Sequence, residues 1–140
     1  MNTTDKKRWI RAVILFGIGY AVVGVTFPAL ANLSTFDGVQ VMSRWAAWLV
    51  CAVAFVVHIA YEHFRLSSPL RSTALHVSLA AAIGAFGLAV AANIHELGAA
   101  SSYRPSLALA LVLWPLMAVV PAFVVALAAA TLIARVRPKS

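Results

Sequence analysis

The stretch Pro105–Ala134, PSLALALVLWPLMAVVPAFVVALAAATLIA, contains no charged residue. About 20 predominantly apolar residues are enough for a helix to cross the hydrocarbon core of a bilayer. Pro115 and Pro121 lie inside the stretch and are expected to kink the helix, so that its outer end tilts or runs along the membrane interface. The stretch therefore predicts a membrane-spanning helix that is longer than an upright crossing requires.

Three further uncharged runs precede it: Ala12–Thr35, Trp45–Tyr61, which extends to about Phe64, and Ser72–His95. The four runs predict helices at about residues 9–33, 44–64, 72–96 and 105–135, with short connections at 36–44, 65–71 and 96–104. Short connections make consecutive helices antiparallel. The predicted fold is an all-α integral membrane protein, a single transmembrane domain with four transmembrane helices in an up-down-up-down bundle.

The composition supports lipid as the main solvent of the chain. Of its 140 residues, 63% are hydrophobic and 11% are charged. Soluble domains have about 45–50% apolar and about 25% charged residues. A water-soluble fold of this length could not hide so much apolar surface, so the lipid bilayer is the first expected partner.

The basic residues are unevenly distributed between the predicted connections. One side of the membrane receives nine of them, Lys6, Lys7, Arg8, Arg11, Arg65, Arg71, Arg135, Arg137 and Lys139, while the other side receives Arg44 and Arg104. This asymmetry predicts that the N- and C-termini are cytoplasmic. The net charge of +7 is then a topology signal, and no nucleic acid partner is expected. The expected location is a bacterial inner or plasma membrane, with multiple crossings.

The N-terminal region also has the pattern of a signal peptide. A basic segment, Met1–Arg11, precedes an apolar segment, Ala12–Thr26, and Ala29-Leu30-Ala31 has an A-x-A cleavage pattern. Cleavage would leave three helices and an external N-terminus. We favour retention because the apolar segment is long for a signal peptide, and because it carries a helical stripe suited to packing in lipid, Gly17, Ala21, Gly24 and Pro28.

The third predicted helix carries a second stripe of small residues, bounded at its two ends by His76 and His95. The small residues are Ala80, Gly84, Gly87 and Ala91. Small residues let helices approach closely in a membrane, and the stripe of the first helix is a candidate partner. The alternative is a groove that holds a flat or elongated ligand between the two histidines.

The second predicted helix carries His58 and Glu62, which are i, i+4 neighbours on one face. Ionisable residues at membrane depth are costly unless they are paired or face a cavity, which makes them candidates for a functional site. They are candidates for binding a small solute, an ion or a proton. The alternative is that Glu62 merely ends the helix and that His58 is a satisfied interior residue.

His76 begins the third predicted helix, so a short connection would place it at about the depth of His58. Two histidines from adjacent helices are potential axial ligands of a b-type haem, or metal ligands together with Glu62 or His63. The chain has no C-x-x-C-H or H-E-x-x-H motif. The sequence leaves the cofactor unknown, with haem b and a metal as alternatives.

Near the outer end of the third helix, Asn93 and Glu96 share a face. With His95 and Tyr103 they would form a polar mouth that binds a ligand or proton; otherwise they mark a helix terminus that reaches water.

Three functions remain open at this stage. The first is binding or transport of a small solute, ion or proton through a His/Glu-bearing cavity between the second and third helices, with a homo-oligomer to complete a path. The second is a non-catalytic assembly subunit of a larger membrane complex. The third is a redox subunit that uses b-type haem or quinone. No catalytic motif is present, so the sequence gives no reason to expect an enzyme.

Overall fold

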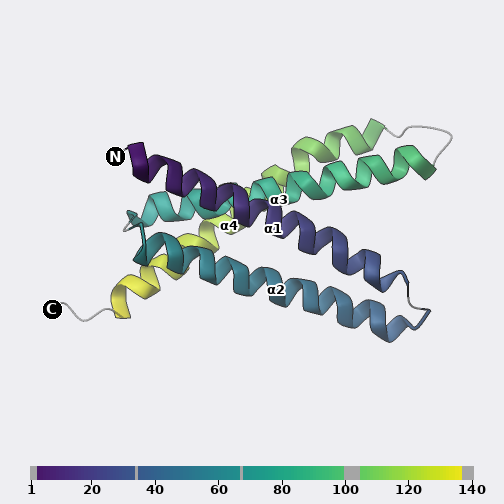
Figure 1. The fold of residues 1–140 in the computed structure, drawn as a ribbon, viewed down its shortest axis with the longest axis horizontal. Coiled ribbons are helices and arrows are strands. Elements are labelled where there is room, and N and C mark those ends of the chain that lie inside the picture. Colours follow the sequence, from purple (N-terminus) through teal and green to yellow (C-terminus); the bar gives the residue numbers. More distant parts are fainter. Residues whose placement is uncertain (1–2, 34, 67, 100–104, 137–140) are drawn as a thin grey trace.

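The computed structural model describes residues 3–33, 35–66, 68–99 and 105–136, and most of this part of the chain is helical. The helices are α1 (Thr3–Ala31), α2 (Asp37–Phe64), α3 (Leu70–Ala99) and α4 (Pro105–Val136), as Figure 1 shows. Each contains a segment that is long and apolar enough to cross a membrane. The prediction of four such helices in an all-α fold is confirmed.

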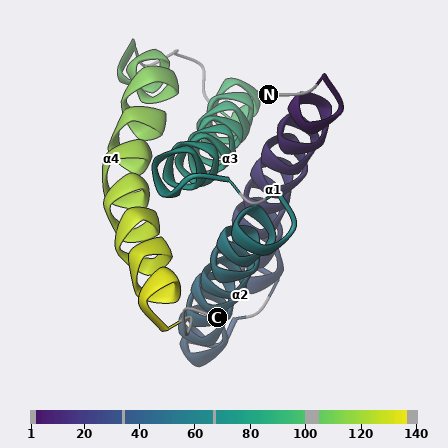
Figure 2. The ribbon, with the colours of Figure 1, turned by 90° about the vertical axis from the view of Figure 1, so that its left-hand side faces the viewer.

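The first connection is shorter than the sequence suggested. Helix α2 begins at Asp37, so most of the expected connection at 36–44 is helical. A carboxylate in the first turn is favourable because it lies at the positive end of the helix dipole, and this explains the early start. Helix α4 contains both Pro115 and Pro121 and continues through them as one helix that curves along its length (Figure 2).

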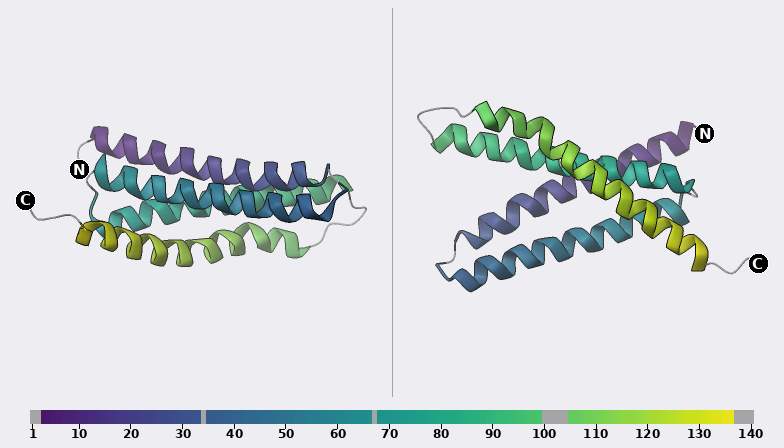
Figure 3. Two further views of the ribbon diagram at one scale, coloured as in Figure 1. Left: turned by 90° about the horizontal axis from the view of Figure 1, so that it is seen from below. Right: turned by 180° about the vertical axis from the view of Figure 1, so that it is seen from behind.

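Helix α3 lies between α1 and α4 and packs against both, whereas α2 packs mainly along α1 (Figure 2). The N-terminal ends of α1 and α3 and the C-terminal ends of α2 and α4 lie at the same end of the bundle (Figure 1). Toward the opposite end, the α1–α2 pair diverges from the α3–α4 pair (Figure 3). Close contact among α1, α2 and α3 is therefore concentrated at one end.

The packed interior consists mostly of small side chains. Ala74 and Ala80 of α3 and Ala126 and Ala130 of α4 are completely buried. Large apolar side chains point outward instead: Met117 of α4 is 73% exposed. This distribution is typical of helices that approach each other through small residues and present large ones to lipid.

Helices α1 and α3 touch most closely at their glycines. An ideal Cβ atom added to Gly87 would lie 2.6 Å from the Cβ of Ala21, and one added to Gly84 would lie 2.6 Å from the Cβ of Tyr20. A Cβ at Gly17 would lie 2.7 Å from Ile83. These distances are shorter than van der Waals contact, so no side chain fits there without moving a helix.

We predict that Gly87→Ala destabilises the protein, because its methyl group would meet the backbone-fixed Cβ of Ala21. Overpacking of this kind costs about 1–3 kcal/mol. Thermal unfolding in detergent, followed by circular dichroism, measures the effect. The matched control is Gly19→Ala on α1, since a Cβ at Gly19 meets nothing within 4 Å. Equal unfolding temperatures for the two variants would contradict the close α1–α3 contact.

Candidate functional site

Four polar side chains meet where α1, α2 and α3 converge, and we call them the Glu62 cluster: His58 and Glu62 of α2, His76 of α3, and Ser68 of the α2–α3 connection. His58 and Glu62 are completely buried. The structure thus brings together three of the residues that the sequence singled out, from two helices. Ser68 is an addition that no sequence pattern indicated.

One oxygen of the Glu62 carboxyl group holds two hydrogen bonds. The hydroxyl of Ser68 donates to Oε2 over 3.0 Å, and Nδ1 of His76 lies 2.9 Å from the same oxygen. Glu62 lies in the last turn of α2, where the negative end of the helix dipole disfavours an anion. The carboxyl group therefore depends on these partners from outside its own helix.

The other oxygen of Glu62 faces His58 without forming a hydrogen bond. Nε2 of His58 lies 3.9 Å from Oε1, which is beyond hydrogen-bonding distance. Oε1 and both ring nitrogens of His58 are buried without a hydrogen-bond partner. Buried polar atoms are nearly always satisfied in folded proteins. The indole N–H of Trp9, the hydroxyl of Tyr20 and both ring nitrogens of His63 are also buried without a partner, but Oε1 of Glu62 and Nε2 of His58 are the two that face each other.

Two aromatic residues of α1 cover the histidines. The ring of Phe16 stacks on His58 with centroids 4.1 Å apart and an interplanar angle of 6°. The ring of Trp9 stacks on His76 at 4.3 Å and 2°. Sequence reasoning missed this role, although Trp9 and Phe16 are separated by seven residues and therefore share a helical face.

The α2–α3 connection folds back onto the end of α2. The backbone N–H of Ser68 donates to the carbonyl of Glu62 over 3.3 Å, and the hydroxyl of Ser68 reaches the carboxyl group of the same residue. The hydroxyl of Thr73, which is completely buried, lies 3.5 Å from the carbonyl of Ser68. Backbone and side-chain contacts together fix Ser68 beside the carboxyl group.

The arrangement does not fit a haem held between His58 and His76. Axial ligation requires both imidazoles to point at one iron with the porphyrin plane between them. Here the carboxyl group of Glu62 occupies the space between the two rings. Within the part of the chain that the structure describes, no group of three or more His, Cys, Asp or Glu side chains is placed to hold a metal ion.

The polar residues near the end of α3 do not form one site. The side-chain amide of Asn93 donates to the carbonyls of Ala89 and of Leu107, both over 2.8 Å, and so links α3 to α4. His95 is exposed and Glu96 is half-buried, and neither has a hydrogen bond to Asn93. Tyr103 lies outside the described residues.

The small stripe of α3 lies against α1 instead of lining an open groove. Gly84 and Gly87 touch Tyr20 and Ala21, and the carbonyl of Ala80 lies 3.1 Å from an ideal Cβ at Gly17. Gly24 meets Leu88 in the same way, while Ala91 is half-buried farther along α3.

Comparison of the chain with models of protein families, with curated proteins and with solved structures finds no match. Within the described residues, the Glu62 cluster is therefore the feature that indicates a function.

We predict that Asn93→Ala weakens the α3–α4 contact by about 1 kcal/mol, a typical value for a polar side chain that links helices in a membrane. Unfolding of the detergent-solubilised protein in sodium dodecyl sulfate measures this loss. His95→Ala, two residues away and exposed, is the control and is expected to leave the midpoint unchanged. If both variants behave as the parent does, Asn93 has no structural role.

Proposed function

We propose that the protein is a small multi-pass membrane protein that binds a proton between Glu62 and His58. The observation that carries the proposal is the unsatisfied pair of atoms, Oε1 of Glu62 and Nε2 of His58, which face each other at 3.9 Å inside the bundle. One proton placed between them would satisfy both atoms after a small approach of the two side chains.

A proton suits this site better than a larger solute. His58 and Glu62 are completely buried, and the rings of Phe16 and Trp9 cover the two histidines. A solute would have to displace α1, whereas a proton needs only a hydrogen-bonded route. Among the ligands expected from the sequence, a small solute, an ion or a proton, the proton is the one that this geometry favours.

Aromatic rings of α1 cover both imidazoles, Phe16 on His58 and Trp9 on His76. Complete burial disfavours a charge on His58, so the bound proton fits best as a neutral carboxylic acid on Glu62 that donates to a neutral imidazole. The basic side chains at this end of the bundle, Lys6, Lys7, Arg8, Arg11, Arg65, Arg71 and Arg135, are exposed. Within the described residues, the basic side chains found within 4 Å of the carboxyl oxygens of Glu62 are His58 and His76.

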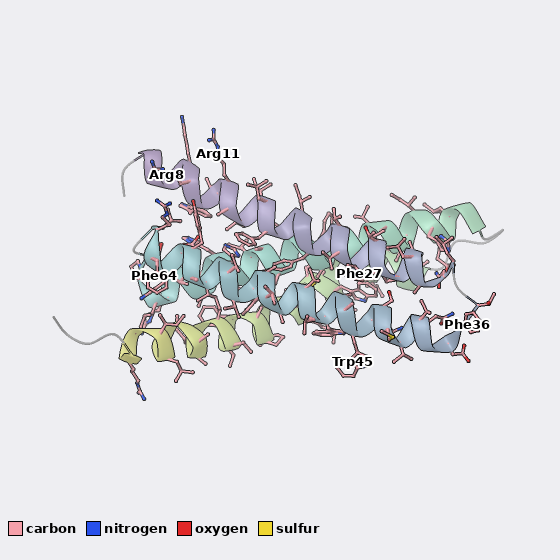
Figure 4. The ribbon with its side chains drawn as sticks, turned by 60° about the horizontal axis from the view of Figure 1, so that its bottom comes forward. Arg8, Arg11, Phe27, Phe36, Trp45 and Phe64 are labelled. Carbon is pink, nitrogen blue, oxygen red and sulfur yellow. The ribbon has the colours of Figure 1, made fainter. Side chains whose placement is uncertain are left out.

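The orientation we assign places both termini and the α2–α3 connection in the cytoplasm. Figure 4 supports this assignment, since Arg8 and Arg11 lie at the end that contains Phe64, and Phe36 lies at the opposite end. The exposed indole of Trp45 lies between the middle of the bundle and that opposite end (Figure 4). Arg104, Arg137 and Lys139 lie outside the described residues. With four antiparallel crossings, the Glu62 cluster lies on the cytoplasmic side of a bacterial inner or plasma membrane.

Transport of the bound proton or of a coupled solute would need a path to the other side. Four helices leave little room for one, so a homo-oligomer is the partner that fits transport best. The runner-up function is an assembly subunit of a larger membrane complex, and it predicts that substitutions of Glu62 and His58 are tolerated.

Proton binding at Glu62 predicts a carboxylic acid infrared band that appears as the pH falls and disappears as the pH rises. The chain has two glutamates, Glu62 and Glu96, so isotope labelling of glutamate gives an assignable difference spectrum. Glu62→Gln should abolish the band of the buried acid in vesicles, while the matched Glu96→Gln should preserve it. An identical labelled spectrum for Glu62→Gln and the parent would refute the proposal.

His58→Phe preserves an aromatic ring against Phe16 but removes both ring nitrogens. Loss of one hydrogen-bonding partner should weaken proton binding at Glu62 about fivefold, since a net hydrogen bond is worth about 1 kcal/mol. The same infrared titration measures this change. The assembly-subunit alternative predicts no difference from the parent.

Cytoplasmic termini predict that a fluorescent protein fused after Ser140 is fluorescent and that alkaline phosphatase fused there is inactive. Fusions after Ala99, at the end of α3, should give the opposite pair of results. Phosphatase activity at the C-terminus would reverse the proposed orientation.

A further inference from the structure

We infer that His76 transfers the proton between water and Glu62, so that the buried carboxyl group exchanges protons only with the side of the membrane that contains the α2–α3 connection. This inference rests on the proposed function, in which Glu62 and His58 hold the proton. It adds a route, a proton-transfer residue and a direction of access.

The side chain of His76 is partly exposed, whereas those of His58 and Glu62 are not. The side chains of Glu62 and His58 are 0% exposed, whereas that of His76 is 14% exposed. His76 also has the shortest contact with the carboxyl group, 2.9 Å from Nδ1 to Oε2. It is therefore the titratable side chain that touches both the surroundings and the buried acid.

The structure closes the route in the other direction along α1 and α3. Phe16 lies flat on His58, and the next contacts outward are those of Gly17 with Ile83 and of Gly84 with Tyr20. At these points the two helices leave no room for a methyl group. This close packing opposes entry of water toward His58 between α1 and α3 from the opposite side.

The two nitrogens of the imidazole ring allow a balanced transfer. A proton from water binds Nε2 of His76; the Nδ1–H bond then breaks, and an O–H bond forms at Oε2 of Glu62. The ring is left neutral with its hydrogen on Nε2, and the reverse sequence returns the proton to the same side. Rotation of the carboxyl group presents its hydrogen to His58. No electrons are transferred and no other bond changes.

Ser68 acts as a positioning residue in this step. Its hydroxyl and backbone N–H hold the carboxyl and carbonyl groups of Glu62, so that Oε2 faces Nδ1 of His76 during the transfer; the later rotation of the carboxyl group breaks the contact with the Ser68 hydroxyl. The charged and titratable groups near this end are Lys6, Lys7, Arg8 and Arg11 of α1, His63 of α2, Arg65 of the connection, Arg71 of α3 and Arg135 of α4. Ion pairs with Glu62 among the described residues come from His58 and His76 alone.

The test follows the Glu62 acid band after a rapid pH change, in sealed vesicles whose orientation is fixed by capture through a C-terminal tag. In the parent protein, a change on the side of the α2–α3 connection should produce the band, and a change on the opposite side should not. His76→Ala should slow formation of the band on the order of a hundredfold, the usual contribution of a positioned acid–base group. Free imidazole, which fits the space left beside Trp9, should restore the rate.

Two further variants separate proton transfer from a merely structural role. His76→Phe preserves a ring against Trp9, so it should fold as the parent does and still show the slow rate without rescue by imidazole. His95→Ala, near the other end of α3, should exchange at the parent rate. Ser68→Ala should slow exchange less than His76→Ala does.

The outcomes distinguish this inference from the proposed function. Equal responses to pH changes on both sides, or a parent-like rate in His76→Ala, would overturn His76 as the route while leaving proton binding at Glu62 intact. Absence of an acid band at any pH in the parent would overturn the proposed function itself. A slow His76→Ala variant that imidazole restores would support the inference.

Discussion

The close approach of α1 to α3 determines the rest of this structure. In lipid, apolar side chains gain little by leaving the solvent, so helices associate through tight packing and interior polar contacts. Glycines on both helices remove the side chains that would hold them apart, and Gly84 and Gly87 accept Tyr20 and Ala21 of α1 at distances that exclude any larger residue. Because α1 is held this close, its residues Phe16 and Trp9 stack on His58 and His76 and cover the side of the Glu62 cluster that faces α1.

The cluster illustrates how a polar group can persist inside an apolar bundle. Glu62 gains two hydrogen-bond partners on one oxygen and leaves the other oxygen without any. A purely structural carboxyl group would be expected to satisfy both, because an orphaned buried acceptor costs about 1–3 kcal/mol. The proposed proton binding depends on this open oxygen and on the imidazole nitrogen that faces it.

The sequence predicted the elements well and the contacts only in part. Uncharged runs identify helices because lipid tolerates few charges, and this constraint located α3 and α4 closely. It missed the starts of α1 and α2, which begin at Thr3 and Asp37 instead of about residues 9 and 44, since charged residues at a helix start resemble a connection. Helical periodicity placed His58 and Glu62 on one face, yet it could not identify the hydroxyl of Ser68 as a partner, because connections have no period.

Periodicity also assigns a face without naming the neighbour. Asn93 and Glu96 share a face in the sequence, but the amide of Asn93 is bound to a carbonyl of α4, a partner that only the packing of α3 on α4 supplies. The sequence could not predict the stacking of Trp9 on His76 either, because it depends on the register in which α1 packs along α3.

The divergence of the two helix pairs has a consequence for the surrounding membrane. The two pairs lie together at the end where α1 and α3 begin and separate toward the end where α2 and α4 begin (Figures 1 and 3). In the proposed orientation these two ends lie in different leaflets, so the lateral pressure of one leaflet would act on the angle between the pairs.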